Sequence, residues 1–222
     1  MHANRLALPL FALLATLALM SCGGSSSNPA MKYTPAELSW CDTTGDCGSF
    51  TDSRDSQSYA WTKIGTQVWM AQNLNYAPAT GNSWCYSNDT TNCTTYGRLY
   101  DWNTADSVCP SGWHLPDTAA WSTLETYVSG SSVAGYKLKS KDSTEWNSNP
   151  GIGGYGFAAI AGGDYNDTVF NDVGYGGNWW TATSNGSASA LVLNMSWAYV
   201  GATFAIDEQA FGYSVRCVKD SL

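Results

Sequence analysis

Cys109-Pro110-Ser111-Gly112-Trp113-His114-Leu115-Pro116 and Ser214-Val215-Arg216-Cys217-Val218 are the two stretches that set the architecture of this 222-residue chain. A bridge between Cys109 and Cys217 would close the second half of the chain into one unit and hold its last strand against its first helix. Closing a loop of about 100 residues contributes on the order of 4–5 kcal/mol on the loop-entropy model. The predicted fold therefore depends on how the cysteines pair.

Seven cysteines occur in the chain, and one of them, Cys22, directly follows an apolar N-terminal run. The other six lie at positions 41, 47, 85, 93, 109 and 217. An even number in an exported chain is typical of disulfides rather than of a metal site. Local spacing favours Cys41–Cys47 and Cys85–Cys93, which leaves Cys109 to pair with Cys217.

The N-terminus has the pattern of an export signal. Arg5 precedes an uncharged run over 6–20, which is shorter than the roughly 20 residues that a membrane-spanning helix needs. The run fits a secretory signal peptide over 1–21. Leu19-Met20-Ser21-Cys22 looks like a bacterial lipobox, so we expect lipidation of Cys22; ordinary cleavage leaving a free thiol is the alternative. The Gly- and Ser-rich stretch within 22–38 predicts a flexible tether.

The expected location is the cell envelope. Gly23 follows the cysteine, where Asp would favour retention at the inner membrane, so we predict a surface-exposed outer-membrane lipoprotein held through its lipid anchor. The formal net charge of −8 opposes binding to nucleic acid or to anionic lipid, because both are polyanions. We expect a monomer without a nucleic-acid partner.

A short lead-in over 39–57, with Cys41 and Cys47, precedes a single domain over 58–222. The domain opens with a predicted hairpin, because 59–64 and 67–70 flank Gly65-Thr66.

Three short helices are predicted next. Residues of 97–105 recur at helical spacing. Asp117 offers an N-cap to a second helix that ends at Gly130, and a third piece covers 133–139.

The second half changes to glycine-rich loops between short strands. We predict strands over 157–160, 179–183, 190–195, 200–206 and 212–218. A hairpin followed by helices and a strand-rich remainder indicates an α+β fold.

Several motifs resemble the Fibrobacter succinogenes major paralogous domain (FISUMP) family. They are Thr51-Asp52-Ser53-Arg54-Asp55, the run from Ile64 to Tyr76, Tyr96-Gly97-Arg98-Leu99-Tyr100, and the two stretches quoted first. The resemblance implies an exported, often lipid-anchored protein and names no activity. More remotely, the pattern resembles the C-type-lectin-like fold, which formylglycine-generating domains share. That resemblance implies an opening hairpin, two to three short helices and a loop-rich antiparallel sheet, cross-linked by disulfides.

The sequence departs from the sugar-binding lectins at their calcium triplets. The Glu-Pro-Asn or Gln-Pro-Asp triplet is absent, and Phe170-Asn171-Asp172 is at best a remnant of Trp-Asn-Asp. A different oxygen-rich cluster is the candidate calcium site: Asp164, Asn166, Asp167 and Asp172. The alternative is turn chemistry, because Asp and Asn side chains bond to nearby backbone. We expect no other cofactor.

Aromatic residues gather around this cluster. Exposed rings stack on sugars or peptides and anchor interfaces. The candidate ligand-binding residues are Tyr165, Phe170, Tyr175, Trp179 and Trp197. Trp179-Trp180 is expected to begin a strand with one ring buried and the other near the surface.

No motif places a catalytic centre. His114 lies in a motif turn, so we expect a scaffold role, and no triad motif surrounds it. We therefore predict a non-enzymatic binding module for polysaccharide or an envelope protein. One alternative is an enzyme, either a carboxylate hydrolase or an oxidative modifier; the other is a structural envelope protein.

Overall fold

The computed structural model describes residues 46–166 and 168–220. The predicted signal peptide, Cys22, the tether and Cys41 lie outside these residues. Within the described part, no helix combines the length and the apolar character needed to cross a membrane.

The smaller sheet contains the predicted hairpin. Its order is β1 (Cys47–Thr51), β2 (Ser58–Ile64), β3 (Gln67–Met70), β13 (Val218–Lys219) and β6 (Trp113–His114). Gly65 turns the chain between β2 and β3 with a φ of 63°, which confirms the hairpin. β1 pairs with β2, so the predicted lead-in segment contributes an edge strand.

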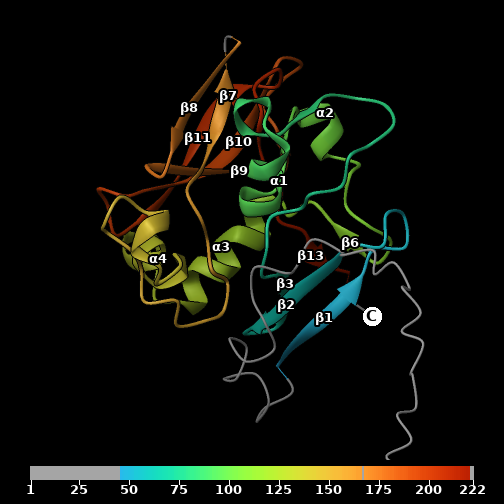
Figure 1. Cartoon of the computed structure of the whole chain (residues 1–222). Coiled ribbons are helices and arrows are strands. Elements are labelled where there is room, and N and C mark those ends of the chain that lie inside the picture. Colours follow the sequence, from blue (N-terminus) through green and yellow to red (C-terminus); the bar gives the residue numbers. More distant parts are fainter. Residues whose placement is uncertain (1–45, 167, 221–222) are drawn as a thin grey trace, which may run out of the picture.

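The larger sheet occupies the other end of the molecule (Figure 1). Its order is β11 (Ala202–Glu208), β10 (Ser189–Ser196), β9 (Gly176–Ser184), β12 (Tyr213–Ser214), β5 (Leu99–Tyr100) and β4 (Ser83–Trp84). β7 (Gly162–Asn166) pairs with β9 and also forms a hairpin with β8 (Val169–Val173). The sheet mixes antiparallel and parallel pairs.

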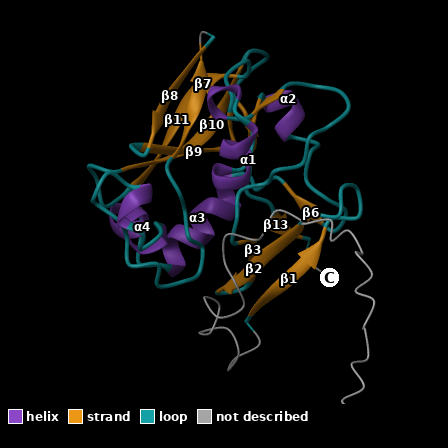
Figure 2. Cartoon of the chain, in the orientation of Figure 1, coloured by secondary structure: helices purple, strands orange, loops and turns teal. Residues whose placement is uncertain are grey.

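The helices are few and short, and loops form much of the chain (Figure 2). They are α1 (Thr90–Tyr96), α2 (Trp102–Ala105), α3 (Thr118–Tyr127) and α4 (Ser131–Leu138), with 3-10 turns at Tyr86–Asn88 and Ser143–Glu145. Asp117 caps α3 as predicted, because its side chain accepts from the Ala120 amide. α4 confirms the third predicted helix.

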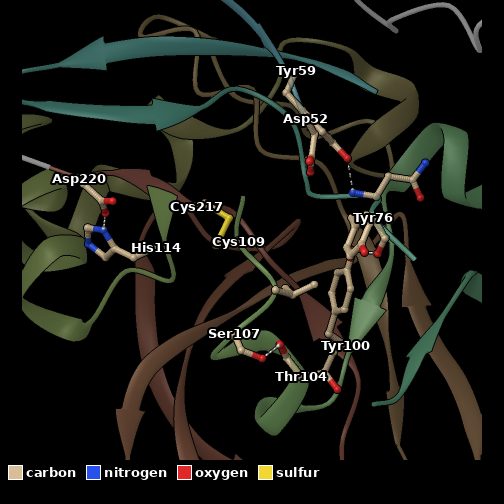
Figure 3. The surroundings of a disulfide bond; sticks show 12 residues. Asp52, Tyr59, Tyr76, Tyr100, Thr104, Ser107, Cys109, His114, Cys217 and Asp220 are labelled. Atoms are coloured by element: carbon tan, nitrogen blue, oxygen red, sulfur yellow. Dashed lines mark hydrogen bonds and ion pairs between the residues drawn. A yellow bond between two sulfur atoms is a disulfide. The ribbon is translucent and has the colours of Figure 1, made fainter. Parts of the chain in front are cut away.

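The C-terminal segment joins the two sheets. β12 lies between β9 and β5 in the larger sheet, and β13 lies between β3 and β6 in the smaller one. The Cys109–Cys217 disulfide fastens this segment, with the two Cα atoms 6.0 Å apart (Figure 3). The predicted Cys85–Cys93 bridge is also present. Cys47 is disulfide-bonded as well, and its predicted partner lies outside the described residues.

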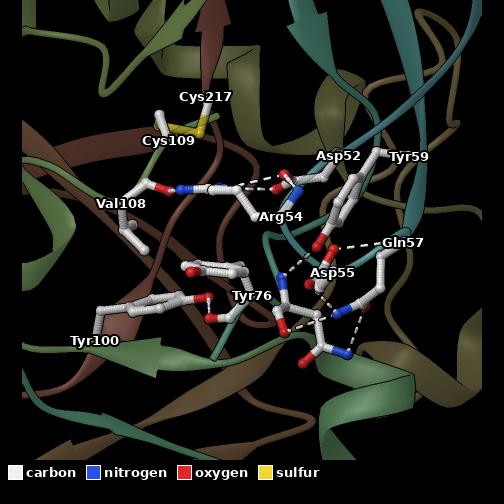
Figure 4. A network of polar contacts seen from close by, with 11 residues as sticks. Asp52, Arg54, Asp55, Gln57, Tyr59, Tyr76, Tyr100, Val108, Cys109 and Cys217 are labelled. Carbon is white, nitrogen blue, oxygen red and sulfur yellow. Dashed lines mark hydrogen bonds and ion pairs between the residues drawn. A yellow bond between two sulfur atoms is a disulfide. The ribbon is translucent and has the colours of Figure 1, made fainter. Parts of the chain in front are cut away.

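A polar network connects the start of the domain to this disulfide (Figure 4). Arg54 donates to both carboxylate oxygens of Asp52 and, through Nη1, to the carbonyl of Val108 at 2.9 Å. Burial alone would raise the pKa of Asp52, but the hydrogen bonds and charge of Arg54 lower it below its ordinary value. The guanidinium also lies 3.9 Å from the Tyr76 ring centroid.

Three elements predicted from the sequence pattern were wrong. The predicted helix over 97–105 is strand β5 followed by the single turn α2, with Asp101 as its cap. The predicted strand over 157–160 forms only one bridge, between Lys139 and Ala159. The predicted strand over 212–218 is split, because its two ends pair in different sheets.

Two cores lie on the two faces of β9. Trp179 belongs to the core with Trp121 and Phe157, and Trp180 belongs to the core with Tyr100 and Tyr213. Both tryptophans are 0% exposed, so the expectation that one ring lies near the surface was wrong. Successive side chains of a central strand point to opposite faces, and here both faces are covered.

A buried cation ties the motif segments together. Arg216 is 1% exposed, and its Nε and Nη2 donate to Asn73 Oδ1 at 3.2 and 2.8 Å. Trp179 Nε1 donates to the same oxygen at 2.9 Å. Arg216 also donates to the carbonyl of Phe157. The motif residues Asn73 and Arg216 therefore join the hairpin end, β9 and the C-terminal segment.

Candidate ligand-binding pocket

A pocket of about 580 Å³ opens on the larger sheet. It is formed by the end of β8, the turn into β9, β10, the loop after β10, and β11. Its lining residues are Asp172, Tyr175, Gly176, Asn194, Ser196, Trp197, Tyr199 and Thr203.

The pocket begins where one face of the sheet changes from apolar to polar. Trp180 on β9 pairs with Val192 on β10, and both are buried. Asn178 lies two residues before Trp180 on β9. It pairs with Asn194 on β10, which pairs in turn with Thr203 on β11. Residues two apart on a strand share a face, so this polar row continues the face of the Trp180 core. It provides hydrogen-bonding groups at the pocket floor.

The rim of the pocket is aromatic. Tyr175, Trp197 and Tyr199 are 48%, 37% and 72% exposed. The Tyr175 and Trp197 rings stand edge to face, with centroids 5.9 Å apart and an interplanar angle of 85°. The Trp197 amide donates to the Tyr175 carbonyl at 2.8 Å, so the backbones that carry the two rings are also joined.

Helix α4 holds the loop that carries Trp197 and Tyr199. Lys139, directly after the helix, is 1% exposed and donates from Nζ to the carbonyls of Ser196 and Tyr199. Its ammonium lies 4.8 Å from the Trp146 ring centroid. Burial lowers the pKa of Lys139 to about 8, while the carbonyls and the ring favour the charged form.

A glycine allows α4 to lie this close to the loop. A Cβ on Gly135 would lie 2.2 Å from the carbonyl oxygen of Gly201. The Tyr136 amide donates to the Val200 carbonyl at 2.7 Å. The loop is therefore fixed from behind through its backbone, which leaves the side chains of Trp197 and Tyr199 outside.

An acid and three asparagines form a network behind the polar row. Asp164 is 5% exposed, and its carboxylate accepts from the amides of Asn166, Asn171 and Asn178 at 3.0, 3.4 and 3.5 Å. The Asn178 Oδ1 accepts in turn from the pocket residue Asn194. Burial raises the pKa of Asp164 to about 6.

Asp172 brings a carboxylate to the pocket itself. It is exposed and has a φ of 60°, a conformation that Asp adopts more readily than most residues. Gly176 lies beside it: a Cβ there would be 3.4 Å from the Asp172 Cβ and 3.9 Å from Oδ2. The absence of a side chain at Gly176 thus leaves room next to the carboxylate.

The predicted aromatic ligand residues separate into three groups. Tyr175 and Trp197 line the pocket. Tyr165 and Phe170 are half-buried and pack on each other at 4.8 Å, outside the lining. Trp179 is fully buried, so its assignment to a ligand surface was wrong. It lies in the core because β9 is a central strand.

Sequence reasoning did not assign Tyr199, Asn194, Ser196 or Thr203 to a site. The aromatic cluster was the only signal for Tyr199. Asn194 and Thr203 meet through the register of β10 and β11, which the sequence does not display.

The predicted calcium ligands do not form an oxygen cage in this arrangement. Asp164 accepts from asparagine amides, and Asn166 Oδ1 accepts from Asn171 at 2.9 Å. Asp172 instead lines the pocket, and Asp167 lies outside the described residues. Over 46–166 and 168–220 no group of three or more His, Cys, Asp or Glu side chains is placed to hold a metal. Calcium binding stays a prediction.

His114 lies away from the pocket lining. It is exposed on β6, and its Nδ1 lies 2.6 Å from Asp220 Oδ1 (Figure 3). This contact ties β6 to the segment after β13.

The chain matches a model of a protein family. The model of the Fibrobacter succinogenes major domain matches residues 62–219. None of the curated proteins and none of the solved structures matches the chain significantly.

Proposed function

The chain belongs to the Fibrobacter succinogenes major domain family, and we propose that it is a non-enzymatic binding module that engages polysaccharide through the pocket on its larger sheet. The observation that carries the proposal is the joint presence of exposed rings and fixed polar groups. Tyr175, Trp197 and Tyr199 supply the rings, and Asp172 and Asn194 supply polar groups of the same lining. Sugars offer both a C–H face that packs on aromatic rings and hydroxyl groups that bond to such polar side chains.

Pre-organisation supports binding at this place. The rim loop is held by Lys139, and the floor amide of Asn194 is held by Asn178. Groups that are already ordered lose little conformational entropy when a ligand binds. The proposed module is displayed at the cell surface as a lipoprotein anchored through Cys22, with a C-type-lectin-like arrangement of its loops. An envelope protein is the other partner class for the same rim.

A glycoside hydrolase is the second candidate. Asp164 has a pKa raised to about 6 by burial, and Asp172 is an exposed carboxylate nearby, which is the contrast in environment that an acid and base pair requires. Asp164, however, does not line the pocket and is covered by asparagine amides. Binding is therefore the better-supported function. Release of reducing ends that Asp164→Asn abolishes would favour the hydrolase.

Retention on insoluble polysaccharide tests the proposal. The full chain, purified in detergent, is applied to cellulose, xylan and peptidoglycan with and without a chelator. We expect retention on at least one of them, and roughly tenfold weaker retention for Trp197→Ala, because a pocket-rim tryptophan is a typical binding hot spot. Loss of retention with the chelator would support the calcium prediction.

The matched control is Tyr127→Ala. Tyr127 is also an exposed ring, at 57%, but lies on α3 outside the pocket lining. Its removal should leave retention unchanged. Equal retention of wild type and Trp197→Ala, or no retention of the folded protein on any of the three, would refute the proposal.

A further inference from the structure

The pocket rim has the geometry of a cation site. Tyr175 and Trp197 meet at 85°, so together they form a corner rather than one flat platform. Tyr199 adds a third exposed ring to the same lining. Perpendicular rings present their negative faces from different directions, which suits a compact positive group.

The pocket lining offers hydrogen-bond acceptors to a cation. The Asp172 carboxylate is acceptor-only when ionised. Asn194 donates one of its two Nδ2 hydrogens to Asn178, and its Oδ1 is an acceptor. Within the lining, Asp172 is the one charged side chain among the described residues. The Lys139 ammonium is turned to the carbonyls of Ser196 and Tyr199 and is 1% exposed, so it does not reach a ligand.

Further acids lie close by. Burial raises the pKa of Asp164, and the negative charges of Asp172 and Asp207 add to the shift. The whole chain has a net charge of −8. An acidic sugar would therefore be repelled, and a neutral one would gain nothing from the charge.

We propose that the pocket selects a sugar unit that carries a protonated amine, with the amine in the corner of Tyr175 and Trp197 and against the Asp172 carboxylate. This proposal rests on the proposed glycan-binding function and gives it a substrate class, a cationic amino-sugar polysaccharide. The rings supply attraction to the cation, and Asp172 supplies an ion pair and a hydrogen bond.

Oligosaccharides that differ only at one substituent test the proposal. The full chain in detergent is titrated by calorimetry with a β-1,4-linked glucosamine oligomer, its fully N-acetylated counterpart and a cello-oligomer of the same length, at a pH that keeps the sugar amine protonated. We expect roughly tenfold tighter binding of the glucosamine oligomer, since an ion pair and a cation–π contact are added together. The preference should shrink in high salt.

Asp172→Asn removes the charge and keeps the shape, so it should reduce the preference for the glucosamine oligomer to the part that the rings supply. Asp106→Asn, at an exposed acid outside the lining, changes the net charge equally and should preserve the preference.

Equal affinity of wild type for the three oligomers would overturn this inference and leave the proposed glycan binding unaffected. No binding of any oligomer or polysaccharide would overturn both. The wild-type comparison needs no variant, so it decides the matter even where Asp172→Asn misfolds.

Discussion

Trp197 stands perpendicular to Tyr175, with ring centroids 5.9 Å apart, although the two residues come from different loops of the larger sheet. A backbone hydrogen bond between the same two residues stabilises this arrangement. Lys139 adds to it, because its ammonium donates to a carbonyl of the loop that carries Trp197. An exposed aromatic pair that is fixed from behind is suited to binding.

Lys139→Met should weaken ligand binding and destabilise the fold together. It leaves the carbonyls of Ser196 and Tyr199 without their donor, which costs about 2 kcal/mol. The loop with Trp197 should then lose its fixed position. Urea unfolding and calorimetric titration measure the two effects. Lys137→Met is the control, because Lys137 lies on α4, is only partly buried and donates from Nζ to Ser129 rather than to the loop; a similar loss in both variants would contradict the assignment.

The charge of Lys139 also predicts a pH effect. Its pKa in the folded protein, about 8, lies below its ordinary value of 10.5. Between these values the unfolded state binds more protons, so the free energy of unfolding should rise with pH in this window. Comparing wild type with Lys139→Met cancels the contribution of other groups that titrate there. A difference between the two that stays constant from pH 8 to 10.5 would contradict the burial of the ammonium.

Asp164→Asn should remove a pH dependence at the acidic end. Burial raises the pKa of Asp164 from 3.8 to about 6, so the carboxyl contributes stability that is complete below pH 3.8 and is lost as the pH rises through 6. We expect wild type to lose about 2 kcal/mol over this range relative to Asp164→Asn. Urea unfolding at a series of pH values measures it. Parallel curves for the two proteins would rule out the raised pKa.

Asp52→Asn should destabilise the connection between the start of the domain and the Cys109 segment. Arg54 would keep its bond to the Val108 carbonyl but lose its carboxylate partner, at a cost of about 2 kcal/mol. Because the folded pKa of Asp52 is lowered, its contribution is present above the unfolded pKa and lost as the pH falls through the folded one. Denaturation of Asp52→Asn and wild type at neutral and acidic pH checks both statements; a difference that grew on acidification would contradict them.

The Cys109–Cys217 and Cys85–Cys93 disulfides should contribute unequally to stability. Cys109 and Cys217 are 108 positions apart, whereas Cys85 and Cys93 are 8 apart. The loop-entropy model gives about 5 kcal/mol for the long bridge and about 2.5 kcal/mol for the short one. Urea unfolding of the two double Cys→Ala variants compares them. A larger loss from the short bridge would show that the C-terminal segment is held mainly by its strand pairing.

Local signals explain which elements could be predicted from the sequence. The hairpin and α3 were predicted correctly from Gly65 and Asp117. A residue suited to positive φ and an N-cap residue can each be recognised from one or two positions of the sequence. α1 was not predicted, since its threonines favour other conformations; Asp89 caps it and the Cys85–Cys93 bridge includes it. β5 and β12 are two-residue strands whose conformation depends on neighbours distant in sequence.

The pocket was only partly predictable for the same reason. Tyr175 and Trp197 could be proposed because aromatic residues in glycine-rich loops are often exposed. Trp179 gave the same signal but lies on a central strand with both faces covered. The polar row of Asn178, Asn194 and Thr203 arises from cross-strand register, which tertiary pairing sets.

Filling the pocket floor tests the central claim most directly. Gly176 lies in strand β9 without a positive φ, so Gly176→Val introduces a β-branched side chain that the strand accepts, next to Asp172. Ala205→Val, on an exposed position of β11 outside the lining, is the control. Calorimetric titration with the glycan that wild type retains should show at least tenfold weaker binding for Gly176→Val at unchanged stability. Wild-type affinity in that variant would place the binding site elsewhere.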